Sequence, residues 1–186
     1  PDEAGGFGAL NFLQSGIQNG SPDGLALIDN ANAVVQFLSY EGSFVATNGV
    51  AIGMTSDNIG VAETSSTPVD HSLQLTGTGS CYEDFTWQAP AAHSRGSLNS
   101  GQTMTGTCMV TIAPGAVFIN EIHYDNASTD VNEGVEIAGP AGTDLSGWTI
   151  ELYNGSTGAT YGTINLSGII PDEAGGFGAL NFLRSG

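Results

Sequence analysis

Positive charge is nearly absent from this sequence. It contains no lysine and only two arginines, Arg95 and Arg184, against 19 aspartates and glutamates, so its formal net charge is −17 at pH 7. Such a surface repels phosphate backbones and anionic lipids, which disfavours direct nucleic-acid binding and membrane association. The same charge suits solubility, saline surroundings or the binding of divalent cations, and the composition alone leaves these three readings open.

Long hydrophobic runs and helical periodicity are also missing. No apolar stretch is long enough for a transmembrane helix, and no lipidation motif or signal peptide is visible, so we expect no membrane insertion. The chain begins at Pro1, which suggests a processed or excised piece. Charged residues make up only 11%, while glycine reaches 28 residues. This composition is typical of many short strands joined by tight turns.

Cysteines are few, and motifs of catalysis are not found. Cys81 and Cys108 are the only two cysteines; neither lies in a CxxC, and no histidine stands at zinc-ligand spacing from them. We expect one disulfide and an extracellular or cell-surface location, with a pair of buried free thiols as the alternative. The sequence has no GxSxG nucleophile turn, P-loop or helix-opening GxGxxG, so we predict that the protein is not an enzyme.

The two ends of the chain repeat each other. Residues 1–16 (PDEAGGFGALNFLQSG) and 171–186 (PDEAGGFGALNFLRSG) match at fifteen of sixteen positions and differ only at Gln14 and Arg184. The period of 170 residues is far longer than a solenoid repeat and suits a whole β-domain. The chain is therefore predicted to be slightly more than one period of a tandem array, or else a permuted chain with a duplicated end.

The pattern of strands relaxes between residues 99 and 116, which places a domain boundary there. We predict that residues 1–105 are the C-terminal part of one repeat, residues 106–115 a linker with one short strand at 108–112, and residues 116–186 the N-terminal part of the next repeat. The alternative is that both parts belong to the same permuted domain.

Alternating apolar and polar residues predict about eight or nine short strands. The candidate stretches from which these strands are drawn cover residues 7–13, 24–30, 33–42, 50–53, 72–77, 81–90, 117–124, 134–139, 148–154 and 159–168, with 177–183 as a second copy of the first. Asn154 and Gly155 form a strong hairpin signal between two of them. Turns every 8 to 12 residues favour an all-β fold, an immunoglobulin-like β-sandwich.

Two stretches resemble a known family. The run INEIHYDNASTDVNEGVEIAGPAGTDLSGWTIELYNG (residues 119–155) is similar to the opening of lamin-tail domains from secreted bacterial proteins, and YEDFTWQAPAAHSRGSLNSGQ (residues 82–102) to their end. Read in permuted order, the resemblance covers most of the chain. It implies an immunoglobulin-like sandwich used as a non-catalytic module, either beside a secreted nuclease or phosphatase or as a repeat of a surface protein. The two cysteines are not part of the resemblance.

The densest group of acidic and amide residues is a candidate calcium site. Its members are Glu121, Asp125, Asn126, Asp130 and Glu133. Calcium needs six to eight oxygen ligands, which a strand end and its following loop could supply, although the spacing is not that of an EF-hand. The alternative is a solvated acidic loop that caps the sandwich. His123 lies in the same stretch, and we expect it on the sheet surface.

The duplicated strand suggests how copies could assemble. A closed sandwich has one place for FGALNFL, yet the chain carries Phe7, Leu10 and Phe12 as well as Phe177, Leu180 and Phe182. One copy is spare or pairs with another molecule, and head-to-tail pairing of this kind builds a filament. We therefore expect a non-enzymatic structural or adhesive repeat of an extracellular fibre or tandem array, whose partners are other copies of itself. The alternatives are an accessory domain of a secreted nuclease or phosphatase, and a carbohydrate-binding module.

Overall fold

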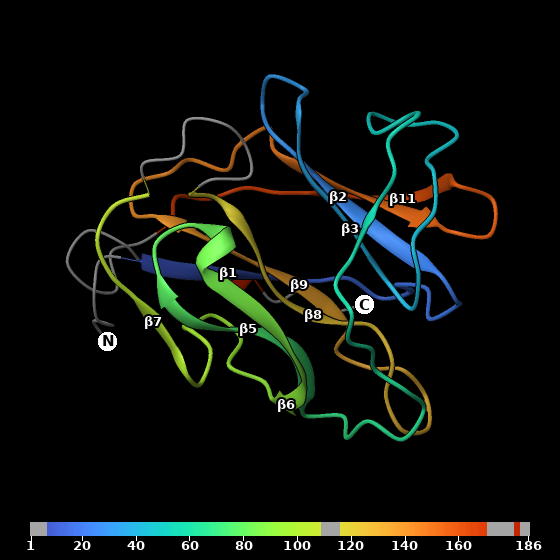
Figure 1. Ribbon diagram of the computed structural model, residues 1–186, viewed down its shortest axis with the longest axis horizontal. Helices are drawn as coiled ribbons and strands as arrows, with labels where there is room; N and C mark the ends of the chain where they lie inside the picture. Colours follow the sequence, from blue (N-terminus) through green and yellow to red (C-terminus); the bar gives the residue numbers. More distant parts are fainter. Residues whose placement is uncertain (1–6, 109–115, 171–180, 183–186) are drawn as a thin grey trace.

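Two β-sheets pack face to face in this protein (Figure 1). The computed structural model describes residues 7–108, 116–170 and 181–182, and nearly all of its regular structure there is strand. The predicted all-β sandwich is confirmed, whereas its assignment to the immunoglobulin-like type stays a prediction.

The larger sheet has seven strands. In spatial order they are β12 (Asn181–Phe182), β1 (Phe7–Leu13), β9 (Gly134–Pro140), β8 (Phe118–His123), β5 (His71–Gly79) and β6 (Phe85–Ala92), with β7 (Gln102–Met104) parallel to β5.

The smaller sheet has five strands. In spatial order they are β11 (Ala159–Asn165), β10 (Thr149–Asn154), β2 (Asp23–Ile28), β3 (Val34–Tyr40) and β4 (Asp57–Asn58).

Both sheets combine strands from before and after residues 109–115. In the larger sheet β1 pairs with β9 and β5 pairs with β8, and in the smaller sheet β2 pairs with β10. Residues 7–108 and 116–170 are therefore interleaved in one sandwich, and each part needs strands of the other to bury its apolar faces.

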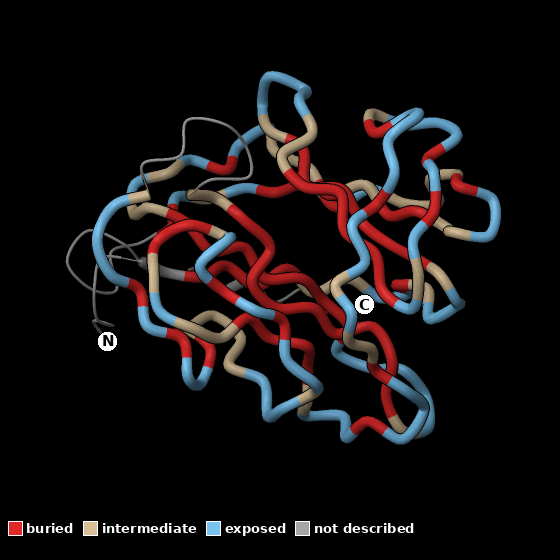
Figure 2. The backbone as a smooth tube through the Cα atoms, in the orientation of Figure 1, coloured by how far each residue is buried: buried red, intermediate tan, exposed pale blue. Residues whose placement is uncertain are grey.

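The core lies between the two sheets, and Figure 2 shows buried backbone running along their central strands. Leu10, Leu25, Leu73 and Ile137 are among its fully buried side chains. β8 is buried at every position, so its outer face is also covered. The cover is the segment that follows β6, because Asn99 in this segment donates to the backbone oxygens of Leu75 and Asn120 at 3.0 Å each.

The predicted hairpin at Asn154 and Gly155 is present between β10 and β11. The Asn154 carbonyl accepts hydrogen bonds from the backbone N–H groups of Thr157 and Gly158, at 3.3 and 2.8 Å. Gly158 has a φ of 69°, a conformation that a glycine adopts without strain. The loop is therefore longer than the two-residue turn that an Asn-Gly pair most often forms.

Three predictions about elements are corrected. Residues 50–53 form turns rather than a strand, since the Met54 N–H donates to Ala51 O at 2.9 Å. The stretch 81–90 begins with a 3₁₀ turn at Tyr82–Asp84, and strand β6 starts only at Phe85. β7 lies within the stretch where no strand was expected. Most of the predicted strand at 108–112 lies outside the described residues.

The predicted disulfide is confirmed. Cys81 precedes the 3₁₀ turn, Cys108 follows β7, and their sulfurs are bonded with the Cα atoms 5.0 Å apart. The bond ties the segment before β6 to the end of the part that precedes residues 109–115. It is compatible with an extracellular protein.

Candidate functional site

The five predicted calcium ligands do not converge on one point. Glu121 lies on β8, where its Oε2 accepts hydrogen bonds from the backbone N–H and the hydroxyl of Ser94 at 3.2 and 2.9 Å. Glu133 precedes β9 and accepts hydrogen bonds from the backbone N–H groups of Gly16 and Ile17. The two carboxylates therefore anchor two different segments of the chain, one at Ser94 and one at residues 16–17.

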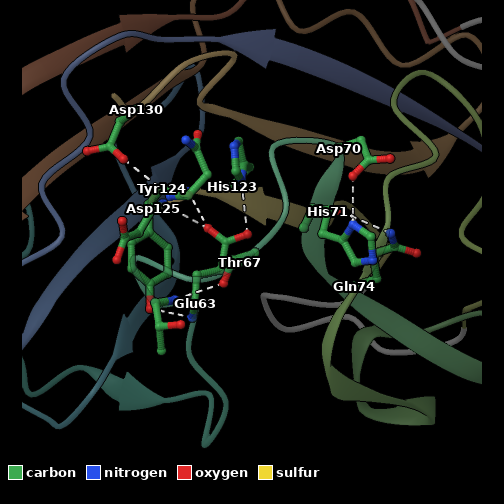
Figure 3. A network of polar contacts seen from close by, with 12 residues as sticks. Glu63, Thr67, Asp70, His71, Gln74, His123, Tyr124, Asp125 and Asp130 are labelled. Atoms are coloured by element: carbon green, nitrogen blue, oxygen red, sulfur yellow. Dashed lines mark hydrogen bonds and ion pairs between the residues drawn. The ribbon is translucent and has the colours of Figure 1, made fainter. Parts of the chain in front are cut away.

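The other three members share one loop after β8. Asp130 accepts a hydrogen bond from the backbone N–H of Asn126 at 3.2 Å, and the Asn126 side chain in turn accepts the Val131 N–H at 3.0 Å. Burial raises the pKa of Asp125, and the charge of nearby Asp130 raises it further. Figure 3 shows both aspartates among the residues of the polar network next to this loop. Within residues 7–108 and 116–170, no three His, Cys, Asp or Glu side chains come close enough together to hold a metal ion.

A buried charge cluster that the sequence did not reveal lies beside this loop (Figure 3). Glu63 is fully buried, and one of its oxygens accepts the backbone N–H groups of Tyr124 and Asp125 at 2.6 and 2.9 Å. Its other oxygen lies 2.9 Å from Nδ1 of His123. The expectation that His123 lies on the sheet surface is wrong, because the residue is only 1% exposed.

His123 is surrounded by hydrogen-bond acceptors on both sides of its ring. Nδ1 faces the Glu63 carboxylate, and Nε2 lies 3.2 Å from the Val131 carbonyl oxygen. Only the protonated ring donates from both nitrogens. Burial by itself would lower the pKa of His123, but the hydrogen bond and the charge of Glu63 outweigh burial and raise this pKa above its usual value. The raised pKa favours a protonated His123, which forms a buried ion pair with Glu63.

Tyrosines extend this cluster to the smaller sheet. The hydroxyl of Tyr124 accepts the Glu63 N–H at 2.8 Å and donates to Glu41 at 3.1 Å. Its ring stacks on Tyr40 of β3, with ring centroids 3.7 Å apart. Burial raises the pKa of Tyr124 well above its usual range, so the hydroxyl stays neutral. The cluster joins the two sheets at one end of the sandwich.

A second polar network covers the outer face of β8 and β9. Glu136 accepts the Gly96 N–H at 2.6 Å and the Asn120 amide at 2.9 Å. Gln102 donates to the Asn120 side-chain oxygen at 2.7 Å. Burial lowers the pKa of Arg95, which lies in the charge field of Glu121, Glu63 and Glu136. These contacts fix the segment after β6 onto the sheet.

The place that β1 occupies beside β9 is the most specific feature near the repeated sequence. All seven residues of β1 pair antiparallel with β9, from Phe7 opposite Pro140 to Leu13 opposite Gly134. Ala9 and Leu10 are fully buried there, and Phe12 is 6% exposed. We call this place, defined by β9 (Gly134–Pro140) and the core residues behind it, the strand slot.

The second copy of the repeated strand meets the first. Asn181 and Phe182 form β12, which pairs parallel with β1 so that Asn181 lies opposite Asn11 and Phe182 opposite Phe12. Of the predicted strand-exchange residues, Phe7, Leu10 and Phe12 thus lie in the strand slot, and Phe182 lies at its outer edge. Phe177 and Leu180 lie outside the described residues.

Asp23 and Asp29 each hold a turn through hydrogen bonds from backbone N–H groups. Asp23 accepts hydrogen bonds from the N–H groups of Gly20 and Gly155 at 2.8 and 2.9 Å, and Asp29 caps the turn between β2 and β3.

No helix in the described part of the chain is long and apolar enough to cross a membrane. No family model matches the chain, and neither the curated proteins nor the solved structures contain a match.

Proposed function

We propose that this chain is a non-enzymatic structural or adhesive repeat of an extracellular fibre or tandem surface array. The observation that carries the proposal is the interleaving of residues 7–108 with residues 116–170 in both sheets. In a chain with a 170-residue period, every part that resembles residues 7–108 has a complementary part on either side of it along the chain. Successive sandwiches are then tied to one another by short connections, which gives an extended array.

Further features support the proposal. The disulfide between Cys81 and Cys108 forms and persists in oxidising surroundings. The net charge of −17 keeps copies soluble and repels other acidic surfaces. The polar clusters around Glu63 and Glu136 are occupied with hydrogen bonds to backbone and amide groups, which fits a load-carrying module better than a catalytic one. The lamin-tail resemblance points in the same direction.

The proposal is tested on a chain that contains three periods of the sequence. Electron microscopy and light scattering should show elongated particles whose length grows with the number of periods. Compact particles, or a parent gene with a single copy, would contradict the array and favour an accessory domain of a secreted nuclease or phosphatase. The same measurement after chelation tests the calcium prediction, because a cation at Asp125, Asn126 and Asp130 would stiffen the particles.

A further inference from the structure

We propose that residues Phe177–Leu183 of one copy of this chain enter the strand slot of a second copy in place of β1, so that copies add head to tail. The inference rests on the proposed function and names the partner, a second copy of the same chain, and the site that receives it. It is carried by the strand slot, by the position of Ile170 and by the single difference between the two ends.

The strand slot fits the side chains of β1 closely. A Cβ atom on Gly134 would lie 2.7 Å from the backbone oxygen of Phe12, and one on Gly139 would lie 3.0 Å from the Ile170 side chain. β1 therefore approaches β9 closely at Gly134, Gly139 leaves room for the Ile170 side chain, and Ala9 and Leu10 fill the core without any exposed surface. Residues 177–183 repeat all seven residues of β1, so they offer the slot the same side chains in the same order.

The chain delivers the second copy to the start of the same slot. Ile170 is fully buried, its N–H donates to Thr143 O at 2.8 Å, and its oxygen accepts the Gly142 N–H at 2.7 Å. Its side chain contacts Gly139, which pairs with Gly8 at the beginning of β1. Six residues separate Ile170 from Phe177. A link of this length spans roughly 20 Å when extended, which reaches the slot of its own molecule or of a neighbour that lies against it.

Each chain carries two copies of the repeated strand but has only one strand slot. The slot holds one copy, and β12 shows the other copy beside it, in register with β1 but outside the slot. Because the two copies are identical over the paired residues, replacement of one by the other exchanges equal contacts. The receiving molecule still has its own residues 177–183 for the slot of the next molecule, so the contact repeats from molecule to molecule without closing.

The one difference between the ends favours the incoming strand. The backbone N–H of Gln14 donates to the backbone oxygen of Glu133 at 2.9 Å, at the acidic end of the slot near Asp130. In the second copy this position is Arg184. An arginine at this position brings a positive charge close to the acidic end of β9, and a surface attraction of this kind strengthens docking about two- to five-fold. We expect both Arg184→Gln and Gln14→Arg to weaken assembly by this factor, since each makes the two competitors equal.

The test compares matched substitutions in the two copies by light scattering and thermal unfolding of the full chain. Wild-type protein should form concentration-dependent dimers and larger species. Leu180→Asp should remain monomeric with an unchanged Tm, because β1 still fills the slot. A wild-type monomer at all concentrations, or Leu180→Asp species equal in mass to wild type, would overturn the proposal.

A rescue experiment separates exchange from simple instability. Leu10→Asp places a carboxylate at a fully buried position, yet it should fold with a Tm near that of wild type because the second copy takes the slot. Leu10→Asp combined with Leu180→Asp leaves no intact strand and should lower Tm by about 10 °C. A single variant as unstable as the double variant would show that the second copy cannot enter the slot. The array itself is judged separately, by particle length against the number of periods.

Discussion

At the scale of single residues, the largest difference from expectation is His123. The side chain is buried against Glu63 and the Val131 carbonyl, so a histidine that alternation places on a strand surface becomes half of an ion pair. Breaking such a pair usually costs more than forming it gains, because the remaining charge stays buried. The pair therefore links the stability of this end of the sandwich to pH.

Protonation of His123 predicts a pH dependence of known sign. Its folded-state pKa is raised above the usual value, so its contribution to the unfolding free energy is complete below about pH 6.5 and disappears as the pH rises through the folded-state pKa. We expect the difference in unfolding free energy between wild type and His123→Gln to shrink as the pH increases from 5.5 to 8.5 in urea titrations. Shifts at groups that do not interact with His123, such as Asp125, cancel in this difference. A difference that does not change with pH would show that His123 is neutral when folded.

Glycine at β9 is a second residue-level constraint. Gly134→Ala would bring a Cβ atom to 2.7 Å from the Phe12 backbone oxygen, so β1 and β9 must separate. We expect it to destabilise the fold by about 1–3 kcal/mol in chemical unfolding. Gly162→Ala in β11 is the matched control, because its nearest neighbour would be a Leu152 side-chain atom at an ordinary 3.4 Å. Equal effects of the two substitutions would mean that strand propensity, and not the close approach, sets the cost.

At the scale of elements, alternation predicted the strands of the interior well and their irregular neighbours poorly. β1, β9 and β10 match their predicted ranges to within a residue. The stretch 50–53 is as apolar as a short strand, but local turns satisfy its backbone groups, which composition cannot reveal. β7 has only three residues, and its pairing with β5 depends on a contact far away in the sequence.

The candidate site was harder to predict than the strands. The sequence places five acidic and amide residues within thirteen positions, which looks like one cluster. The structure divides them because Glu121 and Glu133 point to loops at residues 94 and 16–17, and these loops arrive from distant parts of the chain. Glu63, the partner of His123, lies sixty residues away in a stretch without periodicity, so no local signal marked it.

The disulfide is expected to contribute to the unfolding free energy. Cys81 and Cys108 are separated by 27 positions, and closing a loop of this length lowers the entropy of the unfolded chain. We expect Cys81→Ser together with Cys108→Ser to cost about 3–4 kcal/mol of unfolding free energy. Urea unfolding of wild type with and without reductant gives a second measure on an unaltered sequence. An unchanged unfolding midpoint after full reduction would contradict this value.

At the scale of the whole molecule, the order of the two parts along the chain is the decisive feature. The sandwich is built from residues 7–108 and 116–170, whose strands pair with one another in both sheets. The repeated sequence allows the opposite order, with residue 186 followed directly by residue 17. In either order, one copy of the repeated strand pairs with β9.

A chain in the opposite order is therefore expected to fold. It would run from Ala116 to Gly186 and continue from Ile17 to Cys108, with a single copy of the repeated strand. We expect a monomer with the same disulfide and a Tm within a few degrees of wild type, measured by mass spectrometry of the oxidised protein and thermal unfolding. Failure to fold would mean that the link through residues 109–115 is required, and oligomers would mean that a spare strand is not what joins copies.

The disulfide has a mechanical consequence. In a chain pulled from its two ends, the 26 residues between Cys81 and Cys108 cannot extend after the sandwich opens. At about 3.5 Å per residue they remove roughly 90 Å from the length that each period can release. Each opened period is thus a shorter and stiffer tether under oxidising conditions than after reduction. A force-bearing array of such repeats would lengthen when its surroundings become reducing, and the redox state would set its reach.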